Sequence, residues 1–540
     1  MFVDLDEPAG LDPVRVGSKA ATLAVARRAG VPVLTGFVVE SMASTHHMSI
    51  GARALETRGS GGARLEVSGE PLDFADELIE MGSRLGSQTV ARSSTLLESS
   101  GEWSGAFASY VDLDPAHLPK AVAGCWASAF TVAALDRQRA AGIVPGSWTM
   151  AVLIQSSLQP ESGGWAEISA DGTVDLYGIE GSPAPLLRGW ASGRHARFDG
   201  VWTGDLVDLV GPGHIGAIRD ALALGAEAAG ANRCEWAVDG GVWILQLGAS
   251  PSNRRPQIER SVVTFPEELS DVVRCVVAAP GALGEEVVLP WAMAGLSHVD
   301  VPQMSLGSDP VKLVDRLHRE LTEEVWGLPW SLARPAAARL MSALRSGDVD
   351  EALPALRKLR RPDAVRAGAL LGTLRALRTE MADRGMVADE GEAWHLSLEE
   401  LGAAMDGRRR TAPARVGVGH WEPLVANFVL SSGARSRGIP ASSGVGAGLR
   451  LDVSRPGRGA AVRRVVLTAP DPVPALASLL WDASGLVTTT GSPAAHLFEA
   501  ARALRVPAVC GVDIGGECGA IVAIDGDRGE VATMDLDWEV

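Results

Sequence analysis

Positive charge and long apolar runs are scarce in this chain of 540 residues. The formal net charge of −17 argues against a general nucleic-acid binder, because phosphate backbones select basic surfaces. No apolar run suggests a transmembrane span, since Gly, Pro or a charged residue interrupts each one within about a dozen residues. The acidic first seven residues lack the basic and apolar regions of a secretory signal. We therefore expect neither nucleic acid nor membrane as a partner.

Cysteine is also sparse. The five cysteines are scattered, odd in number and without the spacing of metal ligands. They are typical of reduced thiols, so the expected location is cytoplasmic. The length suggests about three domains of ordinary size, and the 46% of hydrophobic residues can fill several cores. No internal repeat or low-complexity block is present.

The most informative segment lies near the end of the chain. Residues 485–490 are a β-branched run that predicts a strand, and Gly491 supplies a corner. Ser492 as N-cap and Pro493 at the first helical position predict a helix that begins just before His496. The apolar face of that helix is expected to hold Leu497, Ala500, Ala501 and Leu504.

His496 should therefore point away from the core. A neutral imidazole nitrogen can attack phosphorus, and the amide groups and dipole of a helix start can hold the phosphoryl group that it receives. Taken alone, the pattern also fits a surface or capping histidine.

Three ordered blocks near this histidine resemble the mobile phosphohistidine domain of the phosphoenolpyruvate-utilising enzymes. Residues 437–448 are similar to its Gly-Ile-Pro-Ala-Ser opening, residues 465–471 to the strand and loop that follow, and residues 506–511 to Ile-Pro-Ala-Val-x-Gly. Ala495 stands where the family has a hydroxyl residue. The resemblance implies a swivelling β/α domain over residues 438–540, with His496 as the carrier nucleophile.

The N-terminal half resembles the nucleotide-binding domain of the dikinases in the same superfamily. Residues 16–23 are similar to Gly-Gly-Lys-Gly-Ala-Asn-Leu, and residues 90–98 to Val-Arg-Ser-Ser-x-x-x-Glu-Asp. The resemblance implies an ATP-grasp-type domain over residues 1–250, with Lys19 and Arg92 on the ATP phosphates. Lysine and arginine suit those roles as a point charge and a rigid fork of donors. A solvated Lys19 at a helix start is the alternative.

Residues 150–155 predict a strand that places Gln155 beside the adenine pocket. Residues 234–246 predict a β-hairpin, from two alternating strands around Asp-Gly-Gly. In the family this hairpin carries magnesium ligands, here Glu235 and Gln246, and oxygen ligands suit Mg²⁺. An ordinary solvated hairpin is the alternative.

Some family positions differ. Gly248 stands where the family has an arginine two residues after the hairpin glutamine. Ala106 replaces the glutamine of the family's Phe-Ala-Gly-Gln block, and Ser99 replaces the aspartate that follows the glutamate at position 98. The phosphate-covering glycine loop is hard to place near residues 177–181. Loss of a charged phosphate contact puts ATP turnover in doubt. A substitute cation could come from Arg188, Arg194 or Arg197, although solvation at the surface fits each of them.

The predicted architecture is multidomain, α+β and α/β. Residues 250–258 suggest a linker and residues 265–405 a mainly helical acceptor-substrate domain. Residues 406–437 suggest a tether with docking sites, because they surround one apolar island at residues 424–430. Residues 389–401 resemble a segment of the rifampin phosphotransferases. The full synthases bind pyruvate in an eight-fold βα barrel, and the repeated strand-helix units that would predict such a barrel are missing from this sequence. Possible acid/base groups of the helical domain are His298, His318 and His395, although a structural role fits each.

The resemblance implies an enzyme, an ATP- and Mg²⁺-dependent dikinase-type phosphotransferase. It would move the β-phosphoryl group of ATP through a phosphohistidine to a hydroxylated small molecule, giving AMP and phosphate. One alternative is a ligase or condensing enzyme that activates its substrate by phosphorylation. Another is a catalytically degenerate nucleotide-binding scaffold, for which Gly248 and Ala106 are the evidence.

Overall fold

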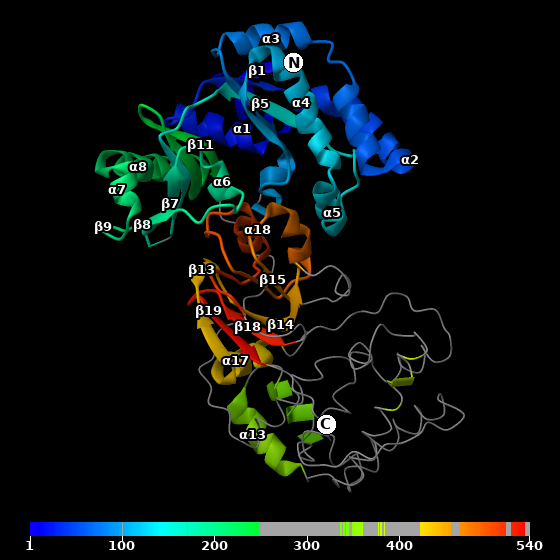
Figure 1. Ribbon diagram of the computed structural model, residues 1–540, viewed down its shortest axis with the longest axis vertical. Coiled ribbons are helices and arrows are strands. Elements are labelled where there is room, and N and C mark those ends of the chain that lie inside the picture. Colours follow the sequence, from blue (N-terminus) through cyan, green and yellow to red (C-terminus); the bar gives the residue numbers. More distant parts are fainter. Residues whose placement is uncertain are drawn as a thin grey trace. The chain divides into compact units, whose positions relative to one another are not determined.

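The computed structural model describes residues 1–99, 101–169, 171–248, 422–454, 465–514 and 520–534, with shorter stretches between residues 335 and 383 (Figure 1). The chain divides into two compact units. The first comprises residues 1–256, 470–481 and 488–505, and the second the remainder. The predicted linker at residues 250–258, most of the predicted helical domain and its three histidines lie outside the described residues. Within that domain, helix α13 spans Val349–Lys358.

The first unit contains a five-stranded antiparallel sheet in the order β1-β2-β5-β3-β4. Alternate residues of its central strands enter different cores, as the two-residue period of a strand requires. Phe37 and Val152 pack in one apolar cluster, whereas Val38 and Leu153 pack in another. The strands are β1 (Phe2–Asp4), β2 (Gly36–Val39), β3 (Thr89–Ser94), β4 (Ser109–Leu113) and β5 (Ala151–Ser156). The strand predicted at residues 150–155 is therefore present.

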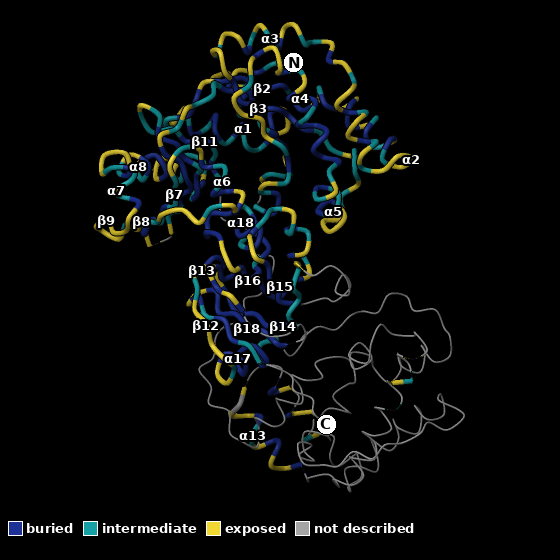
Figure 2. The backbone as a smooth tube through the Cα atoms, viewed as in Figure 1, coloured by how far each residue is buried: buried dark blue, intermediate teal, exposed yellow. Residues whose placement is uncertain are grey.

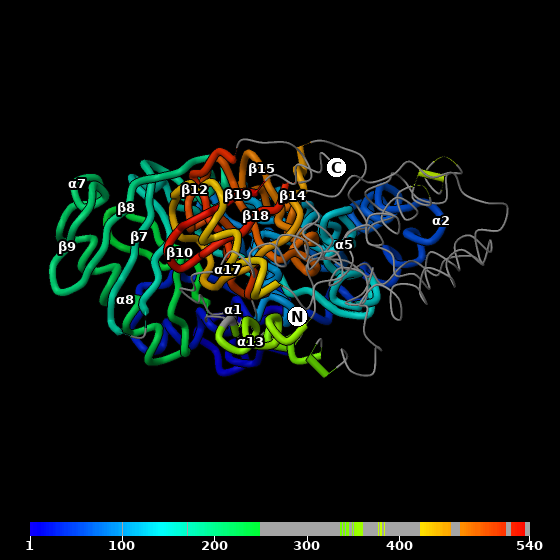
Figure 3. The backbone as a smooth tube through the Cα atoms, turned by 90° about the horizontal axis from the view of Figure 1, so that it is seen from below, coloured from blue at the N-terminus to red at the C-terminus, as the bar shows by residue number. Residues whose placement is uncertain are grey.

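A second antiparallel sheet of the first unit has the order β11-β10-β6-β7-β8-β9. Helices α7 (Leu206–Val210) and α8 (Pro212–Ala229) pack on this sheet (Figures 1 and 3). Its strands are β6 (Ser162–Ile168), β7 (Val174–Glu180), β8 (Arg194–Phe198), β9 (Trp202–Thr203), β10 (Arg233–Val238) and β11 (Val242–Gly248). Strands β10 and β11 form the predicted hairpin, with Asp239 N–H bonded to the carbonyl of Gly241. Residues 177–180, where the glycine loop was sought, belong to β7.

The α-helices of the N-terminal part are α1 (Pro13–Arg28), α2 (Thr45–Gly69), α3 (Ala75–Ser83), α4 (Leu118–Ala127), α5 (Val132–Ala140), α6 (Ala184–Leu187), α7 (Leu206–Val210) and α8 (Pro212–Ala229). Short 3₁₀ turns are η1 (Pro8–Leu11), η2 (Ser41–Ser44), η3 (Leu96–Ser99), η4 (Gly101–Trp103), η5 (Pro115–His117) and η6 (Ser128–Phe130). Among the described residues, no single helix is long and apolar enough to cross a membrane. One pair of helices, residues 115–130 and 132–140, is long and apolar enough when taken together, but it is bent by 49°. Apolar residues of that pair, such as Leu118 and Trp126, lie in a core cluster.

The second unit is built on an eight-stranded mixed sheet in the order β12-β19-β18-β14-β15-β16-β17-β13. Its strands are β12 (Ala434–Arg437), β13 (Ile439–Ser442), β14 (Val445–Asp452), β15 (Val465–Ala469), β16 (Gly485–Thr488), β17 (Ala508–Cys510), β18 (Ile521–Asp525) and β19 (Glu530–Met534). The central strands β15, β16 and β18 are buried along their length (Figure 2). Helix α17 (Glu422–Ser432) packs on β14, β18 and β19. Residues 422–437, assigned to a tether from the sequence, thus form α17 and β12.

Candidate functional site

Lys19 is placed by a break in helix α1. Gly17 has φ 75°, and a Cβ there would come within 2.3 Å of the Ser94 carbonyl group, so only glycine allows this close approach. The turn is anchored by Ser94 Oγ, which accepts from Ala20 N–H at 3.1 Å. Lys19 Nζ then lies 3.0 Å from Glu98 Oε1, and both side chains are about one-tenth exposed. Helix α1 and turn η3 therefore present a partly buried ammonium–carboxylate pair.

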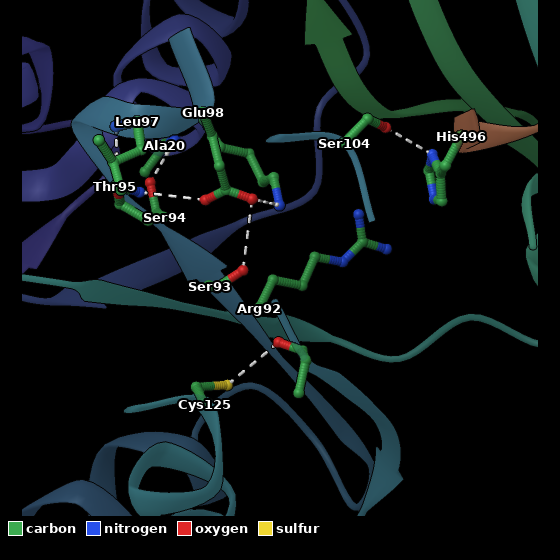
Figure 4. Close-up of polar contacts among 12 residues, drawn as sticks. Ala20, Arg92, Ser93, Ser94, Thr95, Leu97, Glu98, Ser104, Cys125 and His496 are labelled. Carbon is green, nitrogen blue, oxygen red and sulfur yellow. Dashed lines mark hydrogen bonds and ion pairs between the residues drawn. The ribbon is translucent and has the colours of Figure 1, made fainter. Parts of the chain in front are cut away.

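Arg92 joins the two sheets of the first unit. Its side chain starts on β3, and Nη1 donates to the carbonyl of Leu245 on β11 at 2.8 Å. Burial lowers the pKa of the guanidinium, and the charge of Glu235 opposes that shift. An arginine remains protonated across the physiological range, so Arg92 is a fixed cation. In Figure 4 it extends from β3 toward the region where Ser104 and His496 meet.

The predicted magnesium ligands are register partners across the hairpin. Glu235 on β10 pairs with Gln246 on β11, beside a bulge at Glu235/Trp236. Gln155 on β5 is buried and donates through Nε2 to the carbonyl of Leu34 at 2.9 Å. Within the described part of the chain, no group of three or more His, Cys, Asp or Glu residues could hold a metal ion by itself. Two protein ligands suit a Mg²⁺ ion that takes its other ligands from water and phosphate.

His496 is the first residue of helix α18 (His496–Leu504). The sequence predicts Pro493 as the first helical residue, whereas the helix begins at His496 and its N-cap is Ala495, which offers no capping side chain. Ser492 instead closes the preceding turn, since its Oγ accepts from Ala494 N–H at 3.3 Å. Gly491 has φ 103°, and a Cβ there would lie 2.4 Å from Pro472. The four residues assigned to the apolar face are buried.

One cavity of about 920 Å³ brings together all six residues predicted from the sequence. Those residues are Lys19, Arg92, Gln155, Glu235, Gln246 and His496. The cavity lies within the first unit, to which residues 488–505 belong. Its size is typical of a small-molecule site, and its charged groups come from several elements. The geometry therefore places a histidine, two cations, a carboxylate and two side-chain amides around one ligand-sized space.

The neighbours of His496 are residues that the sequence did not single out. Ser104 Oγ lies 2.7 Å from His496 Nδ1 (Figure 4) and also donates to Glu499 Oε2. Glu499 is one turn beyond His496 on the same helix, with its Oε2 3.5 Å from Nδ1. Its other oxygen, Oε1, lies 3.4 Å from Arg233 Nη1. Burial raises the pKa of the Glu499 carboxyl, but the charge of Arg233 and the hydrogen bonds of His496 and Ser104 outweigh it, so the pKa falls well below its usual range.

Two further arginines, of which Arg137 is buried, hold backbone near this network. Arg137 on α5 donates to the carbonyls of Ser104 at 2.8 Å and Pro474 at 2.6 Å. Burial lowers the pKa of Arg137 to about 10. Arg502 donates to the carbonyl of Pro493 at 3.0 Å and lies 5.0 Å from the Trp165 ring centroid. The segments that carry Ser104 and His496 are thus each tied down by an arginine.

The family positions that differ in this chain can also be located. Gly248 lies on the cavity wall with open space beyond its Cα. Of the possible substitute cations, Arg188 lines the cavity, whereas Arg197 is engaged with Asp175 at 3.2 Å. Arg194 is exposed at the start of β8 and does not line the cavity.

Comparison with known families assigns a class to the histidine-bearing part. Residues 462–529 match the mobile domain of PEP-utilising enzymes, and this span contains His496 and Glu499. The match suggests a phosphotransferase that works through a phosphohistidine. No curated protein matches the sequence.

Two solved structures are similar to parts of the chain. The crystal structure of holo-form aconitase X from Thermococcus kodakaraensis is 18% identical, covers 19% of this chain and 100% of its own, and has a TM-score of 0.17. The NMR solution structure of Enzyme I (nEIt) is 16% identical, covers 52% of this chain and 86% of its own, and has a TM-score of 0.13. Similarity at these scores carries no argument about function.

Proposed function

We propose that the protein is an ATP- and Mg²⁺-dependent phosphotransferase of the dikinase type. The observation that supports this most is the shared cavity, in which the His496 imidazole faces the same space as Lys19, Arg92 and the Glu235/Gln246 pair. Lys19 and Arg92 would bind phosphate oxygens, and Glu235 and Gln246 would hold the metal ion. The ion would offset charge on the phosphates.

In the first half-reaction, a ring nitrogen of His496 attacks the β-phosphorus of ATP. The bond from that phosphorus to the oxygen bridging the α- and β-phosphates breaks, and AMP leaves with the oxygen. Water then cleaves the pyrophosphoryl group on the histidine, which releases the γ-phosphate. A hydroxylated small molecule finally attacks the remaining phosphoryl group, its hydroxyl proton is lost, and the imidazole is regenerated. Because one imidazole must serve two sites, the histidine domain would swing between them.

The test is incubation with ATP labelled at the β-phosphorus, followed by measurement of acid-labile label on the protein. We expect label on the wild type and on the control His117→Ala, whose histidine is exposed and does not line the cavity. We expect none on His496→Ala. Label that persists in His496→Ala would mean another carrier, and no label on a wild type that binds ATP would contradict phosphoryl transfer.

Gly248 favours a second candidate, a scaffold that binds nucleotide without turnover. Without the arginine expected there, that wall of the cavity has one fewer cationic side chain to bind phosphate. Calorimetry with ATP and Mg²⁺ separates the candidates when combined with the labelling. Binding without label supports the scaffold, and binding with label supports the enzyme.

A further inference from the structure

Helix α18 presents ionisable side chains at intervals of three residues. His496, Glu499 and Arg502 follow one another at these positions, so Glu499 is a neighbour of each of the other two on the helix surface. Glu499 is buried, although carboxylates are almost never buried without partners. Its partners are Arg233 from β10 and the hydroxyl of Ser104 from the loop after η4. Three separate chain segments therefore meet at the Nδ1 side of His496.

The hydroxyl of Ser104 has one proton to share between two neighbours. The Glu499 carboxylate can only accept when it is ionised, so the Ser104 proton goes to Glu499 Oε2. The bond of 2.7 Å between Ser104 Oγ and His496 Nδ1 then needs a proton from the ring. This assignment puts the imidazole proton on Nδ1 and leaves a lone pair on Nε2.

The ionised state of Glu499 has a structural cause. Arg233 is buried, and its Nη1 lies 3.4 Å from Glu499 Oε1. Opposite charges interact strongly where water is excluded, and the pKa of the carboxyl is correspondingly low. The Arg233 charge thus keeps Glu499 an acceptor, and the direction of the Ser104 hydrogen bond follows from that.

We propose that Glu499, charge-paired with Arg233 and linked through the Ser104 hydroxyl, is a positioning residue that keeps the His496 proton on Nδ1 and makes Nε2 the nucleophile. The role rests on the proposed function, since it concerns which nitrogen attacks phosphorus. When Nε2 bonds to phosphorus, positive charge develops on the ring while the proton stays on Nδ1. The carboxylate stabilises that charge through the hydroxyl, as an oriented carboxylate does for an imidazole in other enzymes.

The experiment reads the tautomer directly, in full-length protein labelled with ¹⁵N-histidine. The His496 resonances are assigned by their absence from His496→Ala, and the two ring nitrogens are distinguished by their coupling to the ring protons. At a pH where the ring is neutral, we expect the wild type to hold the Nδ1–H tautomer. We expect Glu499→Gln and Ser104→Ala to populate the Nε2–H tautomer.

Matched controls separate positioning from folding. Ser104→Thr retains a hydroxyl and should retain the wild-type tautomer. Ser44→Ala removes a buried hydroxyl that accepts from Met150 N–H and donates to the carbonyl of Ser41, away from the cavity lining, and should change nothing at His496. If Glu499→Gln fails to fold, the comparison of Ser104→Ala with Ser104→Thr still tests whether the hydroxyl sets the tautomer of His496.

The second measurement is the rate of labelling with β-labelled ATP. We expect Glu499→Gln and Ser104→Ala to slow phosphohistidine formation about a hundredfold, comparable to the loss of a positioned charge-stabilising donor. The label should be at Nε2 in the wild type. The positioning role of Glu499 would be contradicted by an Nε2–H tautomer in the wild type. It would also be contradicted if Glu499→Gln and Ser104→Ala both kept the wild-type tautomer, even when His496 is labelled. If the tautomers are as expected but no variant and no wild type takes up label, the positioning role of Glu499 is supported and the proposed phosphotransferase function is contradicted.

Discussion

The cavity holds its charged groups in two different ways. On the nucleotide side, Lys19 pairs with Glu98, and that carboxylate also accepts from the nearby Thr95 N–H at 3.1 Å. On the histidine side, Glu499 depends on Arg233 and Ser104, which lie far away in the sequence. The first carboxylate keeps a local partner if its cation is lost, whereas the second loses its main charge partner. The two sides should therefore respond differently to the same kind of substitution.

The largest difference is expected when each cation is replaced by methionine. Arg233→Met leaves the Glu499 charge buried and should lower the free energy of unfolding by about 3–5 kcal/mol. Lys19→Met should cost less, about 1–3 kcal/mol, because Glu98 keeps backbone and hydroxyl donors. Urea unfolding measures both.

The double variant Arg233→Met/Glu499→Leu is the control for the buried charge. It removes both members of the pair and should recover much of the lost stability. Equal losses in Arg233→Met and Lys19→Met would remove the distinction between the two sides.

A smaller effect is expected at the turn that positions Lys19. Gly17→Ala puts a Cβ against the Ser94 backbone at positive φ, and should cost about 1–3 kcal/mol while weakening ATP binding. Gly213→Ala is the matched control, because this helical glycine has open space around it. That change should be neutral or stabilising by about 0.5–1 kcal/mol. Thermal unfolding and ATP calorimetry report the two quantities, and a tolerated Gly17→Ala would contradict the close approach.

The histidine side should also be the more acid-sensitive. The pKa of Glu499 is lowered in the folded state, so its contribution to stability is present above the ordinary carboxylate pKa and is lost as the pH falls below it. Between neutral pH and about pH 3, below the ordinary Glu value, the wild type should therefore lose more stability than Glu499→Gln. Parallel melting temperatures for the two proteins across this range would argue against a strongly stabilised carboxylate.

The smallest effect is expected from restoring a cation to the nucleotide side. Gly248→Arg should tighten ATP binding about three- to tenfold, because one partly solvated charge contact contributes about 1 kcal/mol. Gly248→Ala carries the same backbone change without the charge and should not tighten binding. Calorimetry distinguishes the two variants, and tighter binding by both would assign the effect to the backbone.

The sequence predicted well where the signal is local. Asp239 and the two glycines after it specify a tight turn, and apolar and polar residues alternate on either side of it. These two local signals were enough to predict the hairpin that pairs Glu235 with Gln246. The presence of helix α18 was also predictable, although it begins at His496 rather than at Pro493, because the expected N-cap, Ser492, closes the preceding turn instead. The resemblance to known motifs supplied Lys19 and Arg92, which local patterns would not have distinguished from other cations.

The network around His496 could not be predicted in the same way. Ser104 and Glu499 are 395 positions apart, and no periodicity connects them. A weak signal was present, since a glutamate three residues after a histidine shares its helix face. Nothing in the sequence indicated that Arg233 would meet this face, because the contact depends on how the segments pack. The sequence also singled out the apolar island at residues 424–430 as a docking site within the tether, and this run forms the buried part of α17, which packs on strands.

The hydrogen bonds of Arg137 have a genetic consequence. Its guanidinium reaches the peptide carbonyls of Ser104 and Pro474, and every amino acid carries such a carbonyl. No side-chain replacement at position 474 can abolish the acceptor, whereas almost any replacement at position 137 removes the donor. A mutational scan would therefore register this contact through Arg137 and not through Pro474.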